Sequence, residues 1–299
     1  MENALNNKIG IVILNYLNWE DTLECINSLR SQSDQDFEAV IVENGSPNES
    51  VSRIRDYIKN DKNIHLYVVE NNLGYANGNN MGILYLKNRY SINRILLTNN
   101  DVIFDDEDYI KKLEDIKYSN TIGAIGTKII GSDGLNQNPA YFPISFSSSI
   151  KSLIINLLAF SKIIDFIKKR FLSSWAKKAN DFSSPKTSKQ KYFLHGSVIF
   201  LTENYLDKFM GLYGGTFLYY EEVILGIIFE KAGLDMLYIP DFSIYHKEDQ
   251  SSIQSFNNDD LVRRRYLLQS IWSSFKVYLA NQKKLPDIVS SSIYKHLKE

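Results

Sequence analysis

The sequence has almost no cysteine, no long hydrophobic run and almost no net charge. Its one cysteine, Cys25, excludes an internal disulfide and suits a reducing compartment, where it would be a small apolar residue on a helix face. Apolar residues make up 44% of the 299, but no window of 18 or more lacks charged and polar groups, so no transmembrane helix is expected. Residues 1–8 lack the apolar stretch of a signal peptide. A net charge of −1 gives no general attraction for nucleic acid.

Two common nucleotide-binding motifs are also missing. The absence of G-x-G-x-x-G and of G-x-x-x-x-G-K-[ST] argues against a dinucleotide-binding dehydrogenase and a P-loop phosphotransferase. Glycines 74, 78 and 82 lie instead at helical spacing and would let a helix approach another backbone or a ligand closely. Asparagines gather in the same stretch, either as donors and acceptors for a nucleobase or sugar or for helix capping and turns.

Short apolar runs alternate with helical patterns in the first part of the chain. Buried strands are predicted at residues 8–16, 37–42 and 64–69, with helices between them. This order predicts a parallel sheet joined by right-handed crossovers, and therefore an α/β fold. The length allows one large domain of this kind or two small ones.

The most informative stretch begins at Ile95, where a short apolar run leads into Asn99-Asn100-Asp101. The run predicts a buried strand, so the polar residues would lie at its carboxyl end, where open α/β sheets bind ligands. A hard divalent cation can be held by one or two carboxylates together with substrate phosphates, and Asp101 is placed for that role. A strand followed by an Asn/Asp turn is the alternative interpretation.

Four short motifs stand in order at the ends of predicted strands. They are Val12-Ile13-Leu14-Asn15-Tyr16, Glu43-Asn44-Gly45-Ser46, Asn71-Asn72-Leu73-Gly74-Tyr75-Ala76 and Leu97-Thr98-Asn99-Asn100-Asp101-Val102. Together they resemble a family 2 glycosyltransferase of the GT-A fold, in the branch that makes bacterial polysaccharides and includes rhamnosyltransferase-like enzymes. The resemblance spans roughly residues 8–250.

The resemblance implies a mostly parallel central sheet flanked by helices, in a catalytic domain over residues 1–250. Residues 150–180 would form an insertion in that domain and residues 251–299 a helical C-terminal tail. Within the insertion, the apolar residues of 150–172 share one helix face, and residues 151–178 contain seven Lys or Arg and one Asp. Such a basic amphipathic helix either lies on an anionic membrane surface or packs its apolar face on the sheet.

The resemblance also assigns residues to a sugar nucleotide and to a divalent metal, Mg²⁺ or Mn²⁺. Asp101 would be the carboxylate of the family's D-x-D-type motif, although the first position of that motif is Asn99 here. His246 would approach the metal or the diphosphate, where a neutral imidazole can act as a further ligand. Glu43 stands where the family often has Asp, and Leu17 where it has Asn. The residues expected to bind the sugar nucleotide are Leu14, Asn15, Tyr16, Glu43, Asn44, Asn72, Gly74, Asn79, Asn99, Asn100 and Asp101.

A second group of acidic residues, Glu221 and Glu222, precedes an apolar helical pattern. Acidic residues in the first turn of a helix are often only favoured by the helix dipole. The resemblance implies that Glu222 takes the proton from the acceptor hydroxyl with Glu221 as a supporting residue, although Ile224 and Ile228 replace the usual Asp and Arg. The residues expected on the acceptor side are His195, Gly196 and Tyr220. For His195, a structural role is the alternative interpretation.

These inferences predict an inverting glycosyltransferase that moves a sugar from a UDP- or dTDP-sugar to a glycan or lipid-linked acceptor hydroxyl in cell-surface polysaccharide synthesis. It would be cytoplasmic or peripheral on the inner face of the cytoplasmic membrane. A sugar-1-phosphate nucleotidyltransferase has a similar strand and helix order but normally carries a Gly-rich N-terminal loop with a basic residue, which residues 8–17 lack. A non-catalytic sugar-nucleotide-binding protein is the second alternative, because Asn99, Ile224 and Ile228 replace charged residues.

Overall fold

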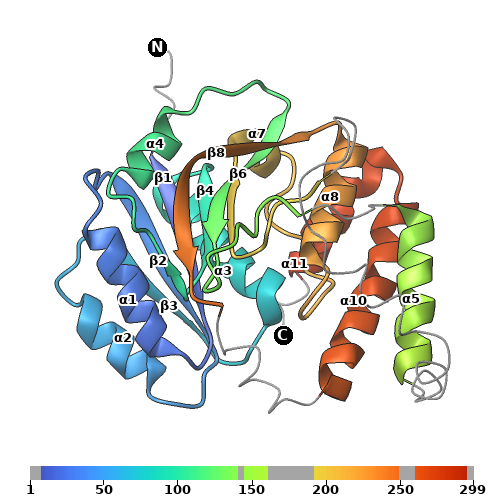
Figure 1. Cartoon of the computed structure of the whole chain (residues 1–299), viewed down its shortest axis with the longest axis horizontal. Helices are drawn as coiled ribbons and strands as arrows, with labels where there is room; N and C mark the ends of the chain where they lie inside the picture. The colour runs from blue at the N-terminus through green and yellow to red at the C-terminus, as the bar shows by residue number, and fades with distance from the viewer. Residues whose placement is uncertain (1–7, 141–144, 161–191, 249–259, 295–299) are drawn as a thin grey trace.

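An eight-stranded sheet with helices on both faces forms the centre of the computed structural model, which describes residues 8–140, 145–160, 192–248 and 260–294 (Figure 1). In chain order the elements are β1 (Ile9–Asn15), α1 (Trp19–Arg30), β2 (Phe37–Asn44), α2 (Ser50–Ile58), β3 (Ile64–Val69), α3 (Gly74–Tyr90), β4 (Ile95–Asn99), β5 (Val102–Ile103), α4 (Tyr109–Asp115), β6 (Ile122–Ile130), α5 (Phe146–Phe160), β7 (Val198–Leu201), α7 (Glu203–Leu206), α8 (Glu221–Ala232), β8 (Asp235–His246), α10 (Asp260–Leu279), the 3₁₀ helix η2 (Gln282–Lys284) and α11 (Leu285–Tyr294).

The strands lie in the order β3-β2-β1-β4-β7-β6-β8-β5. β3, β2, β1 and β4 are parallel, as the alternation of strands and helices predicts. β7 runs antiparallel to both β4 and β6, and β5 runs antiparallel to β8, so the sheet is mixed beyond β4. The predicted α/β class, a central sheet flanked by helices with further helices at the C-terminal end, is confirmed. The antiparallel strands are a feature that the sequence did not indicate.

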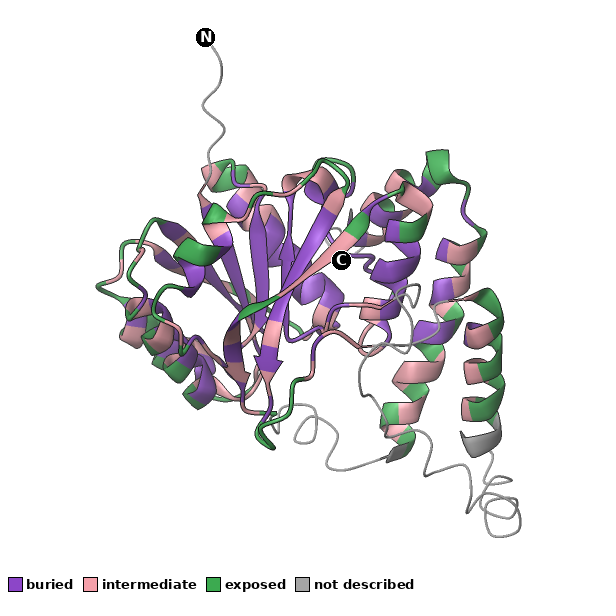
Figure 2. Ribbon diagram, turned by 45° about the horizontal axis from the view of Figure 1, so that its top comes forward, coloured by how far each residue is buried: buried purple, intermediate pink, exposed green. Residues whose placement is uncertain are grey.

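Two apolar cores cover the sheet, one on each face (Figure 2). Ile11 and Ile13 face the core that contains residues of α1, α2 and α4, whereas Val12 between them faces the core with α3, α8 and the C-terminal helices. Strands buried on both faces have continuous apolar sequences instead of an alternating pattern, which explains why the runs were recognisable. Cys25 lies buried in the first core as a small apolar residue, as expected.

The C-terminal helices contribute to the second core. α10 packs against α5 and α8. The buried residues that the two C-terminal helices supply to this core are Ile271, Val277, Leu285, Val289 and Ile293. The expected helical tail is therefore confirmed for residues 260–294, and the domain division at residue 250 stays a prediction.

The predicted amphipathic helix is only partly within the described chain. α5 begins at Phe146, four residues before the predicted start at Ile150, and is described to Phe160. Residues 161–180, which hold most of the basic side chains of the expected insertion, lie outside the described residues. None of the helices that the structure describes combines the length and apolarity needed to cross a membrane.

Helix α3 lies very close to the sheet because of its spaced glycines. A Cβ on Gly78 would lie 2.5 Å from the side chain of Leu14, and a Cβ on Gly82 would lie 2.5 Å from that of Val12. Non-bonded carbon atoms do not approach each other that closely. A side chain at Gly78 or Gly82 would therefore push α3 away from β1 or displace the side chains of Leu14 and Val12. The close approach expected from the glycine spacing is confirmed.

Two asparagines of α3 hold the segment that leads to α8. Asn77 Nδ2 donates a hydrogen bond to the carbonyl of Gly214 at 2.9 Å. Asn80 Nδ2 donates to the carbonyl of Leu212 at 2.9 Å, and its Oδ1 accepts from the Leu212 N–H at 2.7 Å. Asn77 and Asn80 therefore bind the backbone of a distant segment, a role that neither interpretation of the asparagine-rich stretch included.

Replacing Asn80 by alanine should destabilise the fold clearly. Asn80 is fully buried, so the change would leave the N–H and the carbonyl of Leu212 without their hydrogen-bond partner. Each unpaired buried group lowers the free energy of unfolding by about 1–3 kcal/mol. Chemical denaturation should show a lower free energy of unfolding. Asn93→Ala is the matched control, because Asn93 makes only an exposed hydrogen bond to Asp207. Equal stability of the two variants would contradict this role for Asn80.

Candidate active site

The carboxyl ends of β1 and β4 are joined to α1 by one buried amide. Asn100 Nδ2 donates to the carbonyl of Asn18 at 2.6 Å, to Thr22 Oγ1 at 3.1 Å and to Asn15 Oδ1 at 3.3 Å. The Thr22 hydroxyl in turn donates to Asn15 Oδ1 at 2.8 Å. Two of the residues expected at the sugar nucleotide, Asn15 and Asn100, are thus brought together, and their amides are engaged with each other and with α1.

The end of β2 is built in the same way. Glu43 is buried, and its Oε1 accepts from the Ser46 N–H at 3.0 Å and from Asn15 Nδ2 at 3.5 Å. The Ser46 hydroxyl accepts from the N–H of Leu17, a residue with a positive φ of 69°. The longer side chain of Glu43 is therefore accommodated at a position where Asp is usual in the family. Its Oε1 stabilises the turn after β2 by accepting the hydrogen bond from Ser46.

Asn44, Asn72 and Gly74 also meet at this edge. Asn44 Nδ2 donates to Asn72 Oδ1 at 3.1 Å and to the carbonyl of Gly74 at 3.2 Å. Gly74 has a φ of 78°, and a Cβ there would lie 2.1 Å from the carbonyl oxygen of Phe217. Only glycine therefore lets the start of α3 contact the segment before α8. Of the other expected donor-site residues, Leu14, Tyr16 and Asn99 are partly exposed, and Asn79 is buried with its amide bonded to the carbonyl of Tyr75.

Asp101 and His246 meet because β5 pairs with the end of β8. Val102 lies opposite His246 in this short antiparallel ladder, and the Lys247 N–H donates to the carbonyl of Asp101 at 3.0 Å. Asp101 Oδ1 then lies 3.3 Å from His246 Nε2, and both residues are buried. The two predicted metal ligands, which are far apart in the sequence, are thus adjacent in the structure.

A divalent cation fits this pair. Among the described residues no group of three or more His, Cys, Asp or Glu side chains could hold a metal by itself. A hard cation such as Mg²⁺ often takes only one or two protein ligands and completes its shell with waters and substrate phosphates. Two neighbouring ligands of an octahedral cation, each about 2.1 Å from it, are about 3.0 Å apart. The Asp101–His246 separation of 3.3 Å is close to that value.

Glu222 lies against the backbone of Gly196, the residue that follows His195. A Cβ on Gly196 would lie 2.3 Å from Glu222 Oε1, so a side chain there would displace the Glu222 carboxylate. Burial raises the pKa of Glu222, and hydrogen bonding from its own backbone and from that of Gly196 acts in the opposite direction. The Tyr75 hydroxyl donates to the Gly196 carbonyl at 2.5 Å and fixes the turn.

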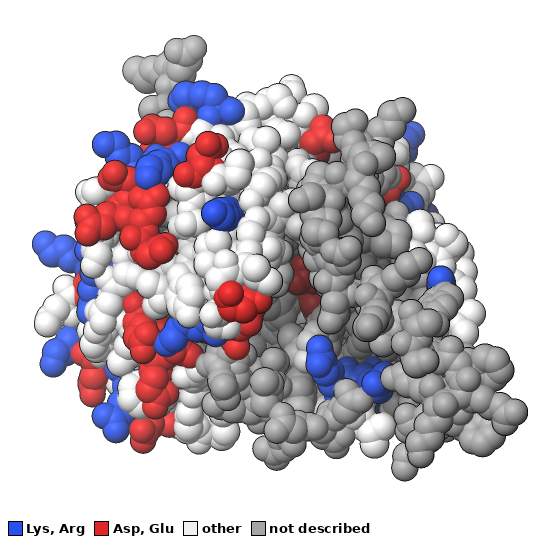
Figure 3. All heavy atoms as spheres, viewed as in Figure 1, with Lys and Arg blue, Asp and Glu red and all other residues white. Residues whose placement is uncertain are grey.

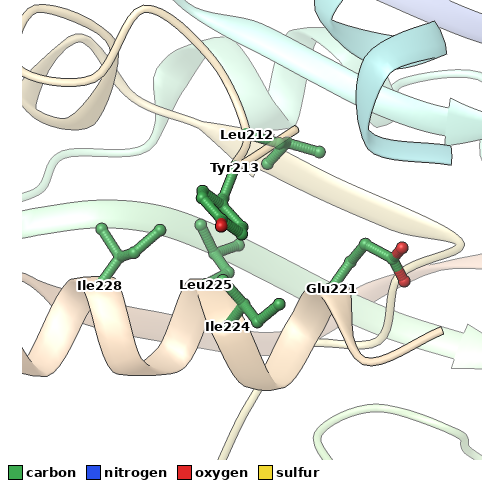
Figure 4. A pocket seen from close by; sticks show the side chains of 6 residues that line it. All are labelled: Leu212, Tyr213, Glu221, Ile224, Leu225 and Ile228. Carbon is green, nitrogen blue, oxygen red and sulfur yellow. The ribbon is translucent and has the colours of Figure 1, made fainter. Parts of the chain in front are cut away.

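Glu221 has a different environment from its neighbour. It lines a small pocket with Leu212, Tyr213, Ile224, Leu225 and Ile228 (Figure 4). Among the described residues its buried Oε1 has no hydrogen-bond partner. Burial first, and the charge of Glu222 second, raise the pKa of Glu221 to about 8. At neutral pH Glu221 is therefore mainly a neutral acid.

His195 is a neutral hydrogen-bond donor at neutral pH. Its Nδ1 accepts from the Ser197 N–H at 3.2 Å, so the proton of the neutral ring is on Nε2. Burial first, and the nearby His246 second, lower the pKa of His195 to about 4, although Asp101 acts in the opposite direction. The His195 and His246 rings are 5.7 Å apart. The turn at 195–197 is therefore next to His246 through His195 and next to Glu222 through Gly196.

Tyr220, expected on the acceptor side, points its hydroxyl toward α5. Its oxygen lies 2.7 Å from Ser149 Oγ, and the residue is buried. Tyr219 and Tyr220 both have positive φ, at 71° and 77°, directly before α8. Such strained backbone often lies at functional sites.

The sequence did not single out Thr22, Tyr75 or Asn138 as parts of this site. Asn138 Oδ1 accepts from the His195 N–H at 3.0 Å, and its Nδ2 donates to the Thr127 carbonyl at 2.7 Å. Each of these contacts joins elements that are distant in the chain. No local sequence pattern could have indicated them, with the exception of Tyr75, which lies within one of the four motifs.

Replacing Glu221 by glutamine should flatten the pH dependence of stability. Because its pKa is about 8 in the folded protein against a usual 4.5, the folded state retains a proton that the unfolded chain has lost at intermediate pH. The contribution of this group is complete below the unfolded pKa and is lost as pH rises through the folded pKa.

Melting temperatures recorded between about pH 5 and 9 should therefore fall more steeply for the wild type than for Glu221→Gln. Glu230→Gln changes an exposed acid of the same helix and should keep the wild-type slope. Parallel curves for wild type and Glu221→Gln would contradict the raised pKa.

Comparison with known proteins identifies the family. The family model described as glycosyl transferase family 2 matches residues 10–173, more than half of the chain. A Haloferax volcanii hexosyltransferase of low-salt glycan biosynthesis, Agl10, is 30% identical over 143 residues, which is 48% of this chain and 43% of that protein. The teichoic acid poly(glycerol phosphate) polymerase of Staphylococcus epidermidis is 32% identical over 85 residues, 28% of this chain and 12% of that one. The chain thus spans less than half the length of these relatives.

Solved structures show the same fold. The Pyrobaculum calidifontis mannosyltransferase in complex with GDP-Man and Mn²⁺ aligns with a TM-score of 0.51 at 12% identity, covering 97% of this chain and 75% of that one. S. aureus TarS 1–349 in complex with UDP-GlcNAc aligns with a TM-score of 0.53 at 13% identity, covering 97% and 73%. At such low identity these likenesses establish the architecture only. The family match and the architecture together show that this chain belongs to glycosyl transferase family 2.

Proposed function

We propose that this protein is an inverting glycosyltransferase that transfers a sugar from a nucleoside diphosphate sugar, UDP- or dTDP-linked, to a hydroxyl of a glycan or lipid-linked acceptor. The observation that carries the proposal is the arrangement around the 195–197 turn. An Asp–His pair suited to a diphosphate-bound cation lies next to His195, and the half-buried carboxylate of Glu222 lies against the backbone of Gly196. Membership of the family, and relatives named for glycan and teichoic acid synthesis, support it.

Different residues of the site would perform different parts of the reaction. Asp101 and His246 would hold the divalent cation, whose chemistry when bound is to neutralise the diphosphate leaving group. Glu222 accepts the proton of the acceptor hydroxyl as that oxygen attacks the anomeric carbon and the bond from this carbon to the diphosphate oxygen breaks. Attack from the face opposite the leaving group inverts the anomeric centre. Neighbours solved with Mn²⁺ support the choice of a divalent metal.

The surrounding groups assist in specific ways. Hydrogen bonds from its own backbone and from that of Gly196 favour the charged form of Glu222, which is the form that can accept a proton. Glu221, as a neutral acid, adds no second negative charge beside the base. The Nε2–H of His195 is available to donate to an oxygen of donor or acceptor. Positioning and charge stabilisation in a buried site would supply most of the rate enhancement.

Glu222→Gln should reduce transfer by about 100-fold or more, because it keeps the shape of the side chain but removes the proton acceptor. Glu221→Gln should reduce it less, since Glu221 is already mostly neutral. Transfer rates at saturating donor, with the dissociation constant of the donor measured in parallel, test this. Donor affinity should be nearly unchanged in both variants.

The opposite ranking of the two variants would make Glu221 the base. Near-wild-type transfer by both would show that the base lies elsewhere. A wild-type protein that binds sugar nucleotide but neither transfers nor hydrolyses it would identify a non-catalytic binding protein.

Asp101→Ala should abolish metal-dependent binding of a nucleoside diphosphate while the fold remains intact. Calorimetric titration with UDP, with Mn²⁺ present or removed by EDTA, measures this directly. Asp105→Ala changes an exposed acid four residues later and should bind as the wild type does. If binding by Asp101→Ala still depends on Mn²⁺, the metal is held elsewhere.

The acceptor side of the proposal includes an anionic membrane surface, because α5 and α10 pack against each other and both expose large apolar side chains. Ring contacts of Phe275 with Phe146 at 5.3 Å and with Trp272 at 6.1 Å join the two helices. Trp272 is 70% exposed and Ile154 51%. The exposed members of this α5–α10 surface are Phe146, Ile150, Ile154, Leu157, Trp272 and Leu279.

Charge supports a membrane as the partner of the α5–α10 surface. Between residues 151 and 178 the sequence has seven Lys or Arg and one Asp, against a net charge of −1 for the whole chain. Acidic side chains gather instead over α1, α2 and α4, on the left in Figure 3, whereas the α5 sequence contains none. A helix with exposed apolar side chains, in a stretch of sequence rich in Lys and Arg, is typical of proteins that bind anionic lipid.

The protein should sediment with vesicles that contain phosphatidylglycerol, and binding should fall as salt rises. The double variant Ile154→Ser/Trp272→Ser should lose most of this binding. Leu135→Ser, which changes an apolar residue that is 66% exposed in the loop after β6, should retain it. Equal binding to neutral and anionic vesicles would contradict the proposal.

A further inference from the structure

The two ring nitrogens of His246 have different neighbours. Nδ1 lies 2.9 Å from Oε1 of Gln137, and Nε2 lies 3.3 Å from Oδ1 of Asp101. Gln137 belongs to the loop after β6 and was not among the residues expected from the sequence. The proton of the neutral imidazole can be on only one of the two nitrogens, so these neighbours decide what His246 presents to Asp101.

The orientation of the Gln137 amide follows from Glu248. Gln137 Nε2 donates to Glu248 Oε1, and the Ser132 hydroxyl donates to Glu248 Oε2 at 3.1 Å. An ionised carboxylate can only accept, so the NH₂ group of the amide must face Glu248. The amide oxygen therefore faces His246 and can only accept from its Nδ1–H. In the neutral ring this leaves a lone pair on Nε2, directed toward Asp101.

The backbone is shaped for the Gln137–Glu248 contact. A Cβ on Gly131 would lie 2.5 Å from Gln137 Nε2 and 2.7 Å from Glu248 Oε1, so a side chain there would displace both groups. Glu248 has a positive φ of 57° directly after β8. The Gln137 N–H donates to the Ile129 carbonyl at 2.9 Å, which holds the loop against β6.

We infer that Gln137 and Glu248 are positioning residues for a divalent cation at Asp101 and His246, which act by keeping the His246 proton on Nδ1. A histidine that binds a metal usually donates its other N–H to an oxygen acceptor, which sets its tautomer and its orientation. This inference rests on the cation of the proposed function. A protonated His246 paired with Asp101 would make the same two contacts without a cation, and the two cases respond differently to substitution.

Measuring Mn²⁺ binding distinguishes a cation held by Asp101 and His246 from a protonated His246 paired with Asp101. Free Mn²⁺ can be followed by its paramagnetic resonance signal in the presence of UDP, GDP or dTDP, with the full chain and without any acceptor. Gln137→Leu keeps the size of the side chain but removes the acceptor for Nδ1–H. Mn²⁺ affinity should fall about 10- to 100-fold, the usual effect of losing such an outer hydrogen bond.

A double-variant test distinguishes positioning from a merely structural role. His246→Ala alone should weaken Mn²⁺ binding, and adding Gln137→Leu to it should weaken binding no further, because Gln137 acts through His246. If Gln137→Leu weakens binding equally with and without His246, it acts through the fold and the inference is overturned. Melting temperature and nucleotide binding in EDTA monitor the fold of each variant.

Exchanging the side chains of residues 137 and 248 should restore Mn²⁺ binding. In Gln137→Glu/Glu248→Gln a carboxylate oxygen still accepts from Nδ1–H and the amide donates back to it, so Mn²⁺ affinity should return to near the wild-type value. Gln137→Glu alone places two carboxylates together and should bind less well than the swap. Wild-type affinity in Gln137→Leu, or a swap no better than Gln137→Leu, overturns the inference. A wild type that binds no Mn²⁺ with any of the three nucleotides also overturns it, whereas transfer measured in EDTA tests the proposed function separately.

Discussion

The active-site edge depends on one buried amide, that of Asn100. Its Nδ2 contacts acceptors on α1, on the turn before it and at the end of β1, and so ties together elements that only the fold brings near. Leaving a buried acceptor unpaired costs about 1–3 kcal/mol, so these contacts leave little freedom in the backbone. Asp101 follows directly, and β5 pairs with β8 immediately after it. The direction of the Asp101 carboxylate toward His246 is therefore a consequence of its neighbours in the chain.

The other half of the site depends on the lack of a side chain at Gly196. His195 and Gly196 are adjacent in sequence, yet the imidazole lies by His246 while the bare backbone lies against Glu222. The neighbouring acids then differ through their surroundings. Hydrogen bonding from the Gly196 backbone supports the charged form of Glu222, whereas Glu221 has a buried oxygen in an apolar pocket and a pKa of about 8. Two carboxylates with separated pKa values can have different roles in one reaction.

The departures from the family pattern have a physical explanation on α8. Ile224 and Ile228 are both buried and both line the pocket at Glu221 (Figure 4). Isoleucine at these positions offers the Glu221 carboxylate no polar partner, and buried, apolar surroundings favour its neutral form. Glu222 instead lies against the backbone of Gly196. The two isoleucines are therefore compatible with the role proposed for Glu222.

The sequence alone determined the α/β class, the parallel strands β1 to β4, the close approach of α3 at Gly78 and Gly82, and the family. These follow from local patterns: apolar runs of strand length, glycines at helical spacing and short motifs at strand ends. Family resemblance also predicted that Asp101 and His246 approach one metal ion, and the structure has Asp101 Oδ1 3.3 Å from His246 Nε2, whereas the metal itself stays a prediction. Only the tertiary structure decided the antiparallel β7 and β5, the anchoring of Asn100, the binding of Asn80 to the Leu212 backbone and the Gln137–Glu248 support of His246. Each of these contacts joins residues that are distant in the chain. Their burial and their hydrogen-bond partners depend on where the whole fold places them, and a local sequence pattern contains no information about that.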